Sequence, residues 1–100
     1  MAKNTKICII GCGNMGRAIL RGIIASKSYD EKNITVSVKS AASKKALSQE
    51  VSCKVLCDNA RAAKGAGMII LAVKPYQMND VLKEIREVLE PKQVVISVAA

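Results

Sequence analysis

Residues 6–16 read KICIIGCGNMG, a short apolar run that leads into three glycines with the spacing Gly-x-Gly-x-x-Gly. The apolar residues 7–10 are typical of a β-strand that is buried on both faces of a parallel sheet. Beyond the glycines, apolar residues recur at helical spacing, which predicts a helix from about Asn14 to Ser26. A strand, a glycine turn and a helix in this order begin a βαβ unit.

Strands and helices continue to alternate along the rest of the chain. Short β-branched or apolar runs predict further strands at residues 33–38, 54–56, 68–73 and 94–98. Helices are expected at residues 43–48, with Ser43 as the N-cap, at 59–64 and at 81–89. Because crossovers between parallel strands are right-handed, the predicted fold class is α/β: a Rossmann-type parallel sheet of about five strands with helices on both faces.

The length of the chain, residues 1–100, allows one domain with a single core. The sequence stops at Ala100, directly after an apolar strand. A buried strand is seldom the last element of a natural domain, so we expect residues 1–100 to be one domain of a longer protein.

The three glycines of the turn fit the dinucleotide fingerprint, in which each has its own task. Gly11 allows the tight turn, Gly13 lets a pyrophosphate approach the backbone, and Gly16 lets the helix pack close to the strand. Unpaired N–H groups at the helix N-terminus then face the phosphates. We therefore expect cofactor contacts from Ile10, Gly11, Cys12, Gly13, Asn14, Met15 and Gly16. A glycine-rich turn without a ligand is the alternative.

The segment after the second predicted strand indicates which dinucleotide is bound. NAD sites usually place an acidic residue there, about twenty residues beyond the glycines, to hold the ribose 2′-hydroxyl. No acidic residue lies between Asn33 and Gln49. The sequence therefore predicts NADP(H), with NADH possible but weaker, and a 2′-phosphate held first by Lys39 and Ser40 and next by Lys44. Lys45 is expected to be an ordinary solvated side chain.

Four cysteines, Cys8, Cys12, Cys53 and Cys57, raise the question of a metal site or a disulfide. The chain has no histidine, and Cys8 and Cys12 fall in an apolar strand and a glycine turn. Small buried hydrophobic residues are the better interpretation, so no metal site is expected.

A net charge of +8 favours anionic ligands in general. With only two tyrosines as aromatic residues and no continuous basic stripe, nucleic acid is not an expected partner. No apolar run approaches the roughly 20 residues of a membrane span, and the N-terminus does not resemble a signal peptide. A cytoplasmic location is expected.

Three segments carry a resemblance to a known family. Residues 10–19, 71–77 and 94–100 are similar, in order and spacing, to the corresponding parts of pyrroline-5-carboxylate reductases. The resemblance implies an oxidoreductase of proline biosynthesis that makes L-proline by hydride transfer from NAD(P)H to the C=N bond of 1-pyrroline-5-carboxylate. It also implies cofactor contacts at Asn59, at Ala72, Val73, Lys74 and Pro75, and at Val98, Ala99 and Ala100.

Two positions after the second strand depart from the family's common pattern. Val38 stands where members often carry a small polar residue, so its side chain can offer no hydrogen bond. Lys39 stands where arginine is common, which keeps the charge but loses the bidentate fork.

Members of the family continue into a helical C-terminal domain that dimerises and supplies the substrate pocket. The chain contains no such segment, so no catalytic residue is assigned; Tyr76, Asp58 and Asp80 are proton-donor candidates by elimination only. We expect the chain to bind NADP(H) with little or no turnover, and the longer protein to be a homo-oligomer acting on a small molecule.

Two other functions fit the same residues. One is another NADP-dependent enzyme, such as a β-hydroxyacid dehydrogenase or an NADP reductase of a deazaflavin. The other is a non-catalytic module that senses dinucleotides.

Overall fold

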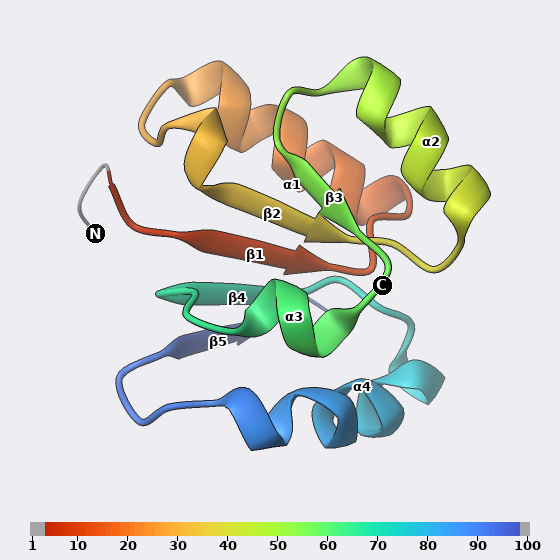
Figure 1. The fold of residues 1–100 in the computed structure, drawn as a ribbon, viewed down its shortest axis with the longest axis vertical. Helices are drawn as coiled ribbons and strands as arrows, with labels where there is room; N and C mark the ends of the chain where they lie inside the picture. The colour runs from red at the N-terminus through yellow and green to blue at the C-terminus, as the bar shows by residue number, and fades with distance from the viewer. Residues whose placement is uncertain (1–3, 99–100) are drawn as a thin grey trace.

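The computed structural model describes residues 4–98 and shows a doubly wound α/β fold (Figure 1). Five strands form one parallel sheet in the order β3-β2-β1-β4-β5. Their bounds are β1 Ile7–Ile10, β2 Ile34–Ser37, β3 Lys54–Leu56, β4 Met68–Leu71 and β5 Val94–Ser97. The predicted fold class is confirmed.

The helices cover both faces of this sheet. Four of them are α-helical, α1 Asn14–Ser26, α2 Ala41–Glu50, α3 Asn59–Ala63 and α4 Met78–Ile85, and three short 3-10 turns lie at η1 Glu31–Asn33, η2 Pro75–Gln77 and η3 Arg86–Val88. Leu20 of α1 and Leu47 of α2 pack on one face with Ile9 of β1. Ala63 of α3 and Ile85 of α4 pack on the other face.

Strand β1 lies at the centre of the sheet and is buried along its whole length. Ile7 is in register with Ile34 of β2 on one side and with Met68 of β4 on the other. The chain runs outward from β1 through β2 to β3, and then returns to the opposite side of β1 as β4. The strand order therefore reverses between β1 and β4, and ligands of such sheets bind outside the carboxyl ends of the strands at this point.

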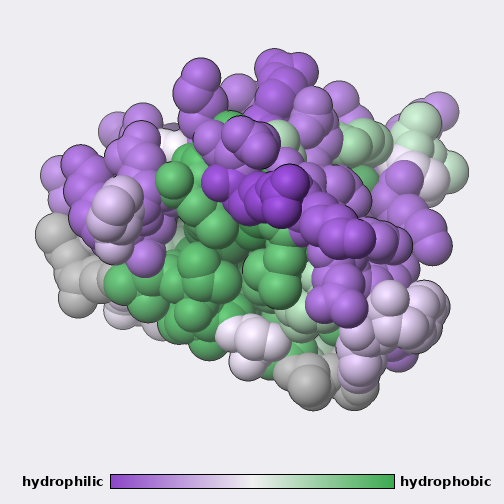
Figure 2. All heavy atoms as spheres, turned by 90° about the horizontal axis from the view of Figure 1, so that it is seen from below, coloured by the Kyte–Doolittle hydropathy of each residue, from purple (hydrophilic) through white to green (hydrophobic). Residues whose placement is uncertain are grey.

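Strand β5 differs from the other strands because its side chains are exposed. Val94, Val95 and Ile96 keep 42%, 41% and 39% of their surface accessible, although β5 pairs with β4. Figure 2 shows a broad apolar area on the side of the molecule where β5 lies. This edge of the sheet is thus apolar as well as open.

The structure corrects the predicted helix at residues 43–48. That helix is α2, which begins at Ala41 and is capped by Ser40, not Ser43: the Ser40 hydroxyl accepts the Ser43 N–H at 3.1 Å. Ser40 has the extended backbone (φ −139°, ψ 160°) that an N-cap requires, whereas Ser43 lies within the first turn.

Two other predicted elements differ in extent. The apolar pattern at residues 81–89 is helical only to Ile85 and continues as the 3-10 turn η3, while the helix begins earlier, at Met78. The predicted strand 68–73 ends at Leu71, although Ala72 and Val73 remain buried.

Candidate dinucleotide-binding site

A cleft of about 740 Å³ opens at the carboxyl ends of β1, β2 and β4, at the point where the strand order reverses. The glycine turn after β1 forms one wall, and the turn after β4 together with α4 forms another. Residues that follow β2 and β3 complete it. The cleft thus lies where an open parallel sheet binds its ligands.

The three glycines of the turn have different reasons to be glycine. A Cβ on Gly11, which has φ +86°, would lie 2.5 Å from Val73 Cγ1, and one on Gly16 would lie 2.6 Å from the Gly11 carbonyl oxygen. A Cβ on Gly13 would meet no atom within 4 Å. Packing within the chain therefore explains Gly11 and Gly16, while Gly13 leaves open space in the cleft that a side chain would fill.

The N-terminus of α1 offers backbone donors to that space. Gly13 is its N-cap and provides no side-chain cap, and the first turn contains no acidic residue. The N–H groups of a first turn have no partner within their helix, and the helix dipole adds positive potential there. The loop therefore fits a phosphate or pyrophosphate group.

The end of β2 brings one of the predicted basic residues to the cleft. Lys39 lines it, whereas Lys44 is exposed on α2 outside it. The Ser40 hydroxyl is used as the α2 cap and also donates to the Ser43 hydroxyl at 3.0 Å, and Ser43 rather than Ser40 lines the cleft. Val38 lines it with an apolar side chain.

The turn after β4 is fixed by backbone hydrogen bonds. The Ala72 N–H donates to the Ile10 carbonyl at 2.8 Å, which ties this turn to the end of β1. The Gln77 side chain accepts the Lys74 N–H at 3.1 Å, and the Gln77 N–H donates to the Lys74 carbonyl at 2.9 Å. Pro75 begins the 3-10 turn between them and does not line the cleft.

Three polar side chains in the cleft are linked by hydrogen bonds. The Ser37 hydroxyl donates to Asn59 Oδ1 at 2.5 Å, and Asn59 Nδ2 donates to Glu84 Oε2 at 3.0 Å. Ser37 is 1% exposed at the end of β2, whereas Asn59 begins α3 and Glu84 lies on α4. Three separate elements thus meet at the Asn59 amide.

The cysteines have different environments. Burial raises the pKa of the Cys8 thiol to about 12 and that of Cys53 to about 11, which agrees with the prediction of small buried side chains. Burial also raises the pKa of Cys12, which is half-buried at the cleft. The prediction is wrong for Cys57: it is exposed and lines the cleft, because it follows the end of β3 at the sheet edge.

Of the predicted cofactor residues, nine line the cleft: Ile10, Gly11, Cys12, Gly13, Lys39, Asn59, Ala72, Val73 and Lys74. Seven lie outside its lining: Asn14, Met15, Gly16, Ser40, Lys44, Pro75 and Val98. Ala99 and Ala100 lie outside the described residues. Nine further residues line the cleft and are not among the predicted cofactor contacts: Ser37, Val38, Ser43, Cys57, Tyr76, Gln77, Asp80, Val81 and Glu84. Most of them follow a strand or begin α4, a position that could have identified them.

The proton-donor candidates are divided between two places. Tyr76, 79% exposed, and Asp80 line the cleft. Asp58 instead caps α3, accepting the Arg61 N–H at 3.2 Å.

Residues 4–98 contain neither a cluster of metal-ligand side chains nor a helix that could span a membrane. Within this range no three histidine, cysteine, aspartate or glutamate side chains are grouped to hold a metal ion. None of the helices in the same range is both long and apolar enough to cross a membrane.

Comparisons with known proteins agree with this geometry. The family model described as "NADP oxidoreductase coenzyme F420-dependent" matches residues 6–100. A pyrroline-5-carboxylate reductase of Vibrio alginolyticus is 39% identical over 98% of the chain, which covers 36% of that protein. The chain thus spans about a third of the length of this curated relative.

Solved structures give the same result. A pyrroline-5-carboxylate reductase from Coxiella burnetii superposes with a TM-score of 0.87 at 34% identity, over 97% of this chain and 36% of that one. The Plasmodium falciparum enzyme, solved with NADP bound, shares the fold with a TM-score of 0.83 at 24% identity, over 99% of this chain and 35% of that one. The chain therefore belongs to the NADP oxidoreductase family whose model it matches, and pyrroline-5-carboxylate reductases are among the relatives to which it is similar along nearly its whole length.

Proposed function

We propose that residues 1–100 are the NADP(H)-binding domain of a pyrroline-5-carboxylate reductase. The observation that carries this proposal is the glycine turn, where Gly13 leaves open space for a ligand beside the N-terminus of α1. The family match over residues 6–100 supports it, as does a relative of the same fold that was solved with NADP bound.

In this proposal the pyrophosphate lies against the glycine turn. Backbone N–H groups at the start of α1 donate to its oxygens, and Gly13 allows the close approach. The nicotinamide half extends toward the turn after β4, with contacts from Ala72, Val73, Lys74 and Pro75, and toward the end of β5, with contacts from Val98, Ala99 and Ala100.

The adenosine half extends toward the end of β2. Lys39 pairs with the 2′-phosphate, and Ser40 and Lys44 remain proposed contacts although neither lines the cleft. Charge-assisted hydrogen bonds contribute about 1.5–3 kcal/mol each. Two of them would favour NADPH over NADH by a factor on the order of a hundred or more.

The reaction proposed for the whole protein reduces 1-pyrroline-5-carboxylate to L-proline, the last step of proline biosynthesis. The cofactor supplies hydride for the imine carbon, and the imine nitrogen takes up a proton. We assign no catalytic residue to the chain and expect it to bind NADP(H) with little or no turnover alone.

Several properties of the whole protein belong to the same proposal. We place it in the cytoplasm as a homo-oligomer that acts on a small-molecule substrate. Neither nucleic acid nor a membrane is a proposed partner.

A chimera tests this proposal. The chain would replace the matching third of the Vibrio alginolyticus relative, to which it is 39% identical. NADPH consumption with 1-pyrroline-5-carboxylate is the expected result, and the same chimera with Gly13→Asp, which places a carboxylate in the phosphate space, should be inactive. A folded chimera that binds NADPH but never consumes it with this substrate would contradict the assigned reaction.

A further inference from the structure

The Asn59 amide is held from two sides by side chains, and one of them, Glu84, imposes its orientation. Ser37 donates to its oxygen at 2.5 Å and Glu84 accepts from its nitrogen at 3.0 Å. A carboxylate can only accept hydrogen bonds, so the amide nitrogen must face Glu84. If the amide turned over, its oxygen would face the Glu84 carboxylate and that hydrogen bond would be lost, whereas the Ser37 hydroxyl can donate or accept.

This arrangement leaves part of the amide free for a ligand. An amide oxygen can accept two hydrogen bonds and an amide nitrogen can donate two. Among residues 4–98, each of these atoms makes one hydrogen bond. Asn59, Ser37 and Glu84 all line the cleft, so one acceptor position and one N–H remain available at its floor.

The position of the amide selects one half of the cofactor. Ser37 lies two residues before Lys39 on the same strand end, and its carbonyl accepts the Gly11 N–H of the glycine turn at 3.1 Å. The Asn59 amide is thus joined through Ser37 to the strand end that connects the glycine turn with Lys39. In the proposed binding mode the adenosine, whose hydroxyls and base both donate and accept hydrogen bonds, lies along this strand end.

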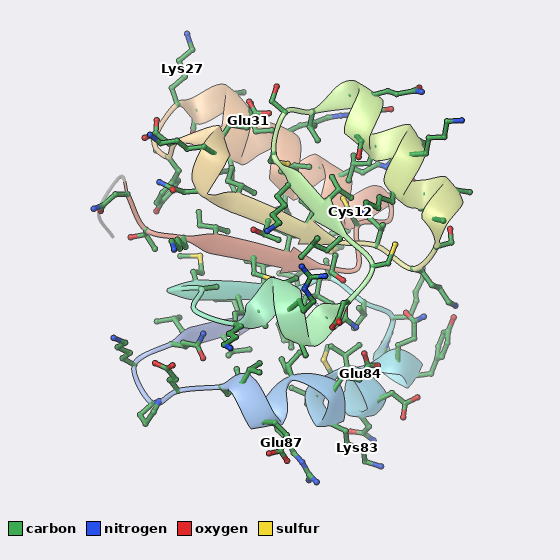
Figure 3. The ribbon with its side chains drawn as sticks, in the orientation of Figure 1. Cys12, Lys27, Glu31, Lys83, Glu84 and Glu87 are labelled. Carbon is green, nitrogen blue, oxygen red and sulfur yellow. The ribbon has the colours of Figure 1, made fainter. Side chains whose placement is uncertain are left out.

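Glu84 is otherwise an unfavourable residue in this cleft. A carboxylate repels the phosphates of an anionic ligand. Figure 3 shows Glu84 on the side of α4 that faces α3, whereas its neighbours Lys83 and Glu87 point away from the sheet. The hydrogen bond that Glu84 accepts from the Asn59 amide would offset this repulsion if it orients the amide for the ligand.

We propose that Ser37 and Glu84 are positioning residues that present the Asn59 amide to the adenosine half of the bound dinucleotide. The inference rests on the proposed function, because it requires the cleft to hold NADP(H). It adds two residues that do not themselves need to touch the cofactor.

The probe is adenosine 2′,5′-bisphosphate, titrated calorimetrically into the chain. Asn59→Ala should weaken binding about five- to tenfold, the effect of one lost hydrogen bond. Glu84→Ala should also weaken it, although the variant removes a negative charge. Glu84→Gln, which keeps an acceptor for the amide, should restore most of the lost affinity.

The control is Glu87→Ala. It removes the same charge from an exposed side chain that, among residues 4–98, pairs with Arg86 alone, at 3.8 Å, and that lies outside the cleft lining. Its affinity should equal or slightly exceed that of the unchanged chain. Tighter or unchanged binding by Glu84→Ala would overturn the proposal.

A double-variant cycle separates positioning from independent contacts. If Ser37 acts through the amide, Ser37→Ala should weaken binding in the unchanged chain but not in the Asn59→Ala background. Losses that multiply would contradict this role. Circular dichroism and thermal unfolding check each variant; if Ser37→Ala does not fold, the same cycle with Glu84→Ala decides.

Titration of the unchanged chain with NADPH distinguishes a failure of the proposed function from a failure of the inference about Asn59. No binding of NADPH would refute the proposed function and this inference together. Normal binding of NADPH combined with unchanged affinity in the Asn59 and Glu84 variants would refute the inference alone.

Discussion

The carbonyl oxygen of Ser37 accepts the backbone N–H of Gly11 at 3.1 Å, so the end of β2 holds the glycine turn that follows β1. The Ala72 N–H holds the other side of that turn through the Ile10 carbonyl, at 2.8 Å. The turn is thus fixed between its two neighbouring strands before any ligand arrives. A loop held in its binding conformation loses less entropy when it binds.

Substitutions of Gly13 and Gly16 should have different effects on the stability of the chain and on its affinity for NADPH. Gly13→Ala places a Cβ in open space, so the free energy of unfolding should change by no more than about 1 kcal/mol, the loss expected from a poorer N-cap, while NADPH affinity should fall at least about tenfold. Gly16→Ala places a Cβ 2.6 Å from the Gly11 carbonyl and should cost about 1–3 kcal/mol of stability. Urea unfolding and NADPH titration measure both quantities; a destabilised Gly13→Ala with normal affinity would reverse the assignment.

Lys39 should determine the choice between the two dinucleotides. Lys39→Asp puts a carboxylate where the 2′-phosphate is proposed to lie, so the ratio of NADPH to NADH affinity should fall by about a hundredfold or more. The matched control is Lys45→Asp, the same change in an exposed side chain outside the cleft lining. Equal ratios in Lys39→Asp and the unchanged chain would exclude Lys39 as the phosphate ligand.

Strands β1 and β5 should differ in their contribution to stability. Ile9 of β1 is fully buried, and Ile9→Ala should cost about 2–5 kcal/mol. Ile96 of β5 is 39% exposed, and Ile96→Ala should cost about 1–2 kcal/mol. Denaturant unfolding of the two variants gives the comparison, and similar losses would mean that β5 is more deeply buried in solution than the structure shows.

Thiol labelling should follow the exposure of the cysteines. Cys57 is exposed at the cleft and should react first with a thiol reagent, more slowly once NADPH fills the cleft. Cys8, whose pKa burial raises to about 12, should react only after unfolding. Mass spectrometry locates the label, and Cys57→Ser is the control. Rapid labelling of Cys8 in the folded chain would be inconsistent with its burial.

Features set by neighbouring residues could be predicted from the sequence. The apolar run of β1, the Gly-x-Gly-x-x-Gly spacing and the helical pattern of α1 all lie within residues 7–26, and α1 has the predicted bounds. The parallel sheet followed from the alternation of strands and helices alone.

Features set by distant residues could not be predicted. The Asn59 amide meets Ser37 from 22 residues away and Glu84 from 25 residues away, and neither spacing follows a periodic pattern. The choice between Ser40 and Ser43 as helix cap depended on where the backbone becomes extended, since both side chains have the same chemistry. The exposure of Cys57 depended on β3 being the outer strand.

The most direct test of the proposed binding site is calorimetric titration of the chain with NADPH and, separately, with NADH. We expect saturable binding of NADPH and an affinity for NADH that is lower by a factor on the order of a hundred or more. No heat with NADPH, or equal affinities for the two cofactors, would contradict it.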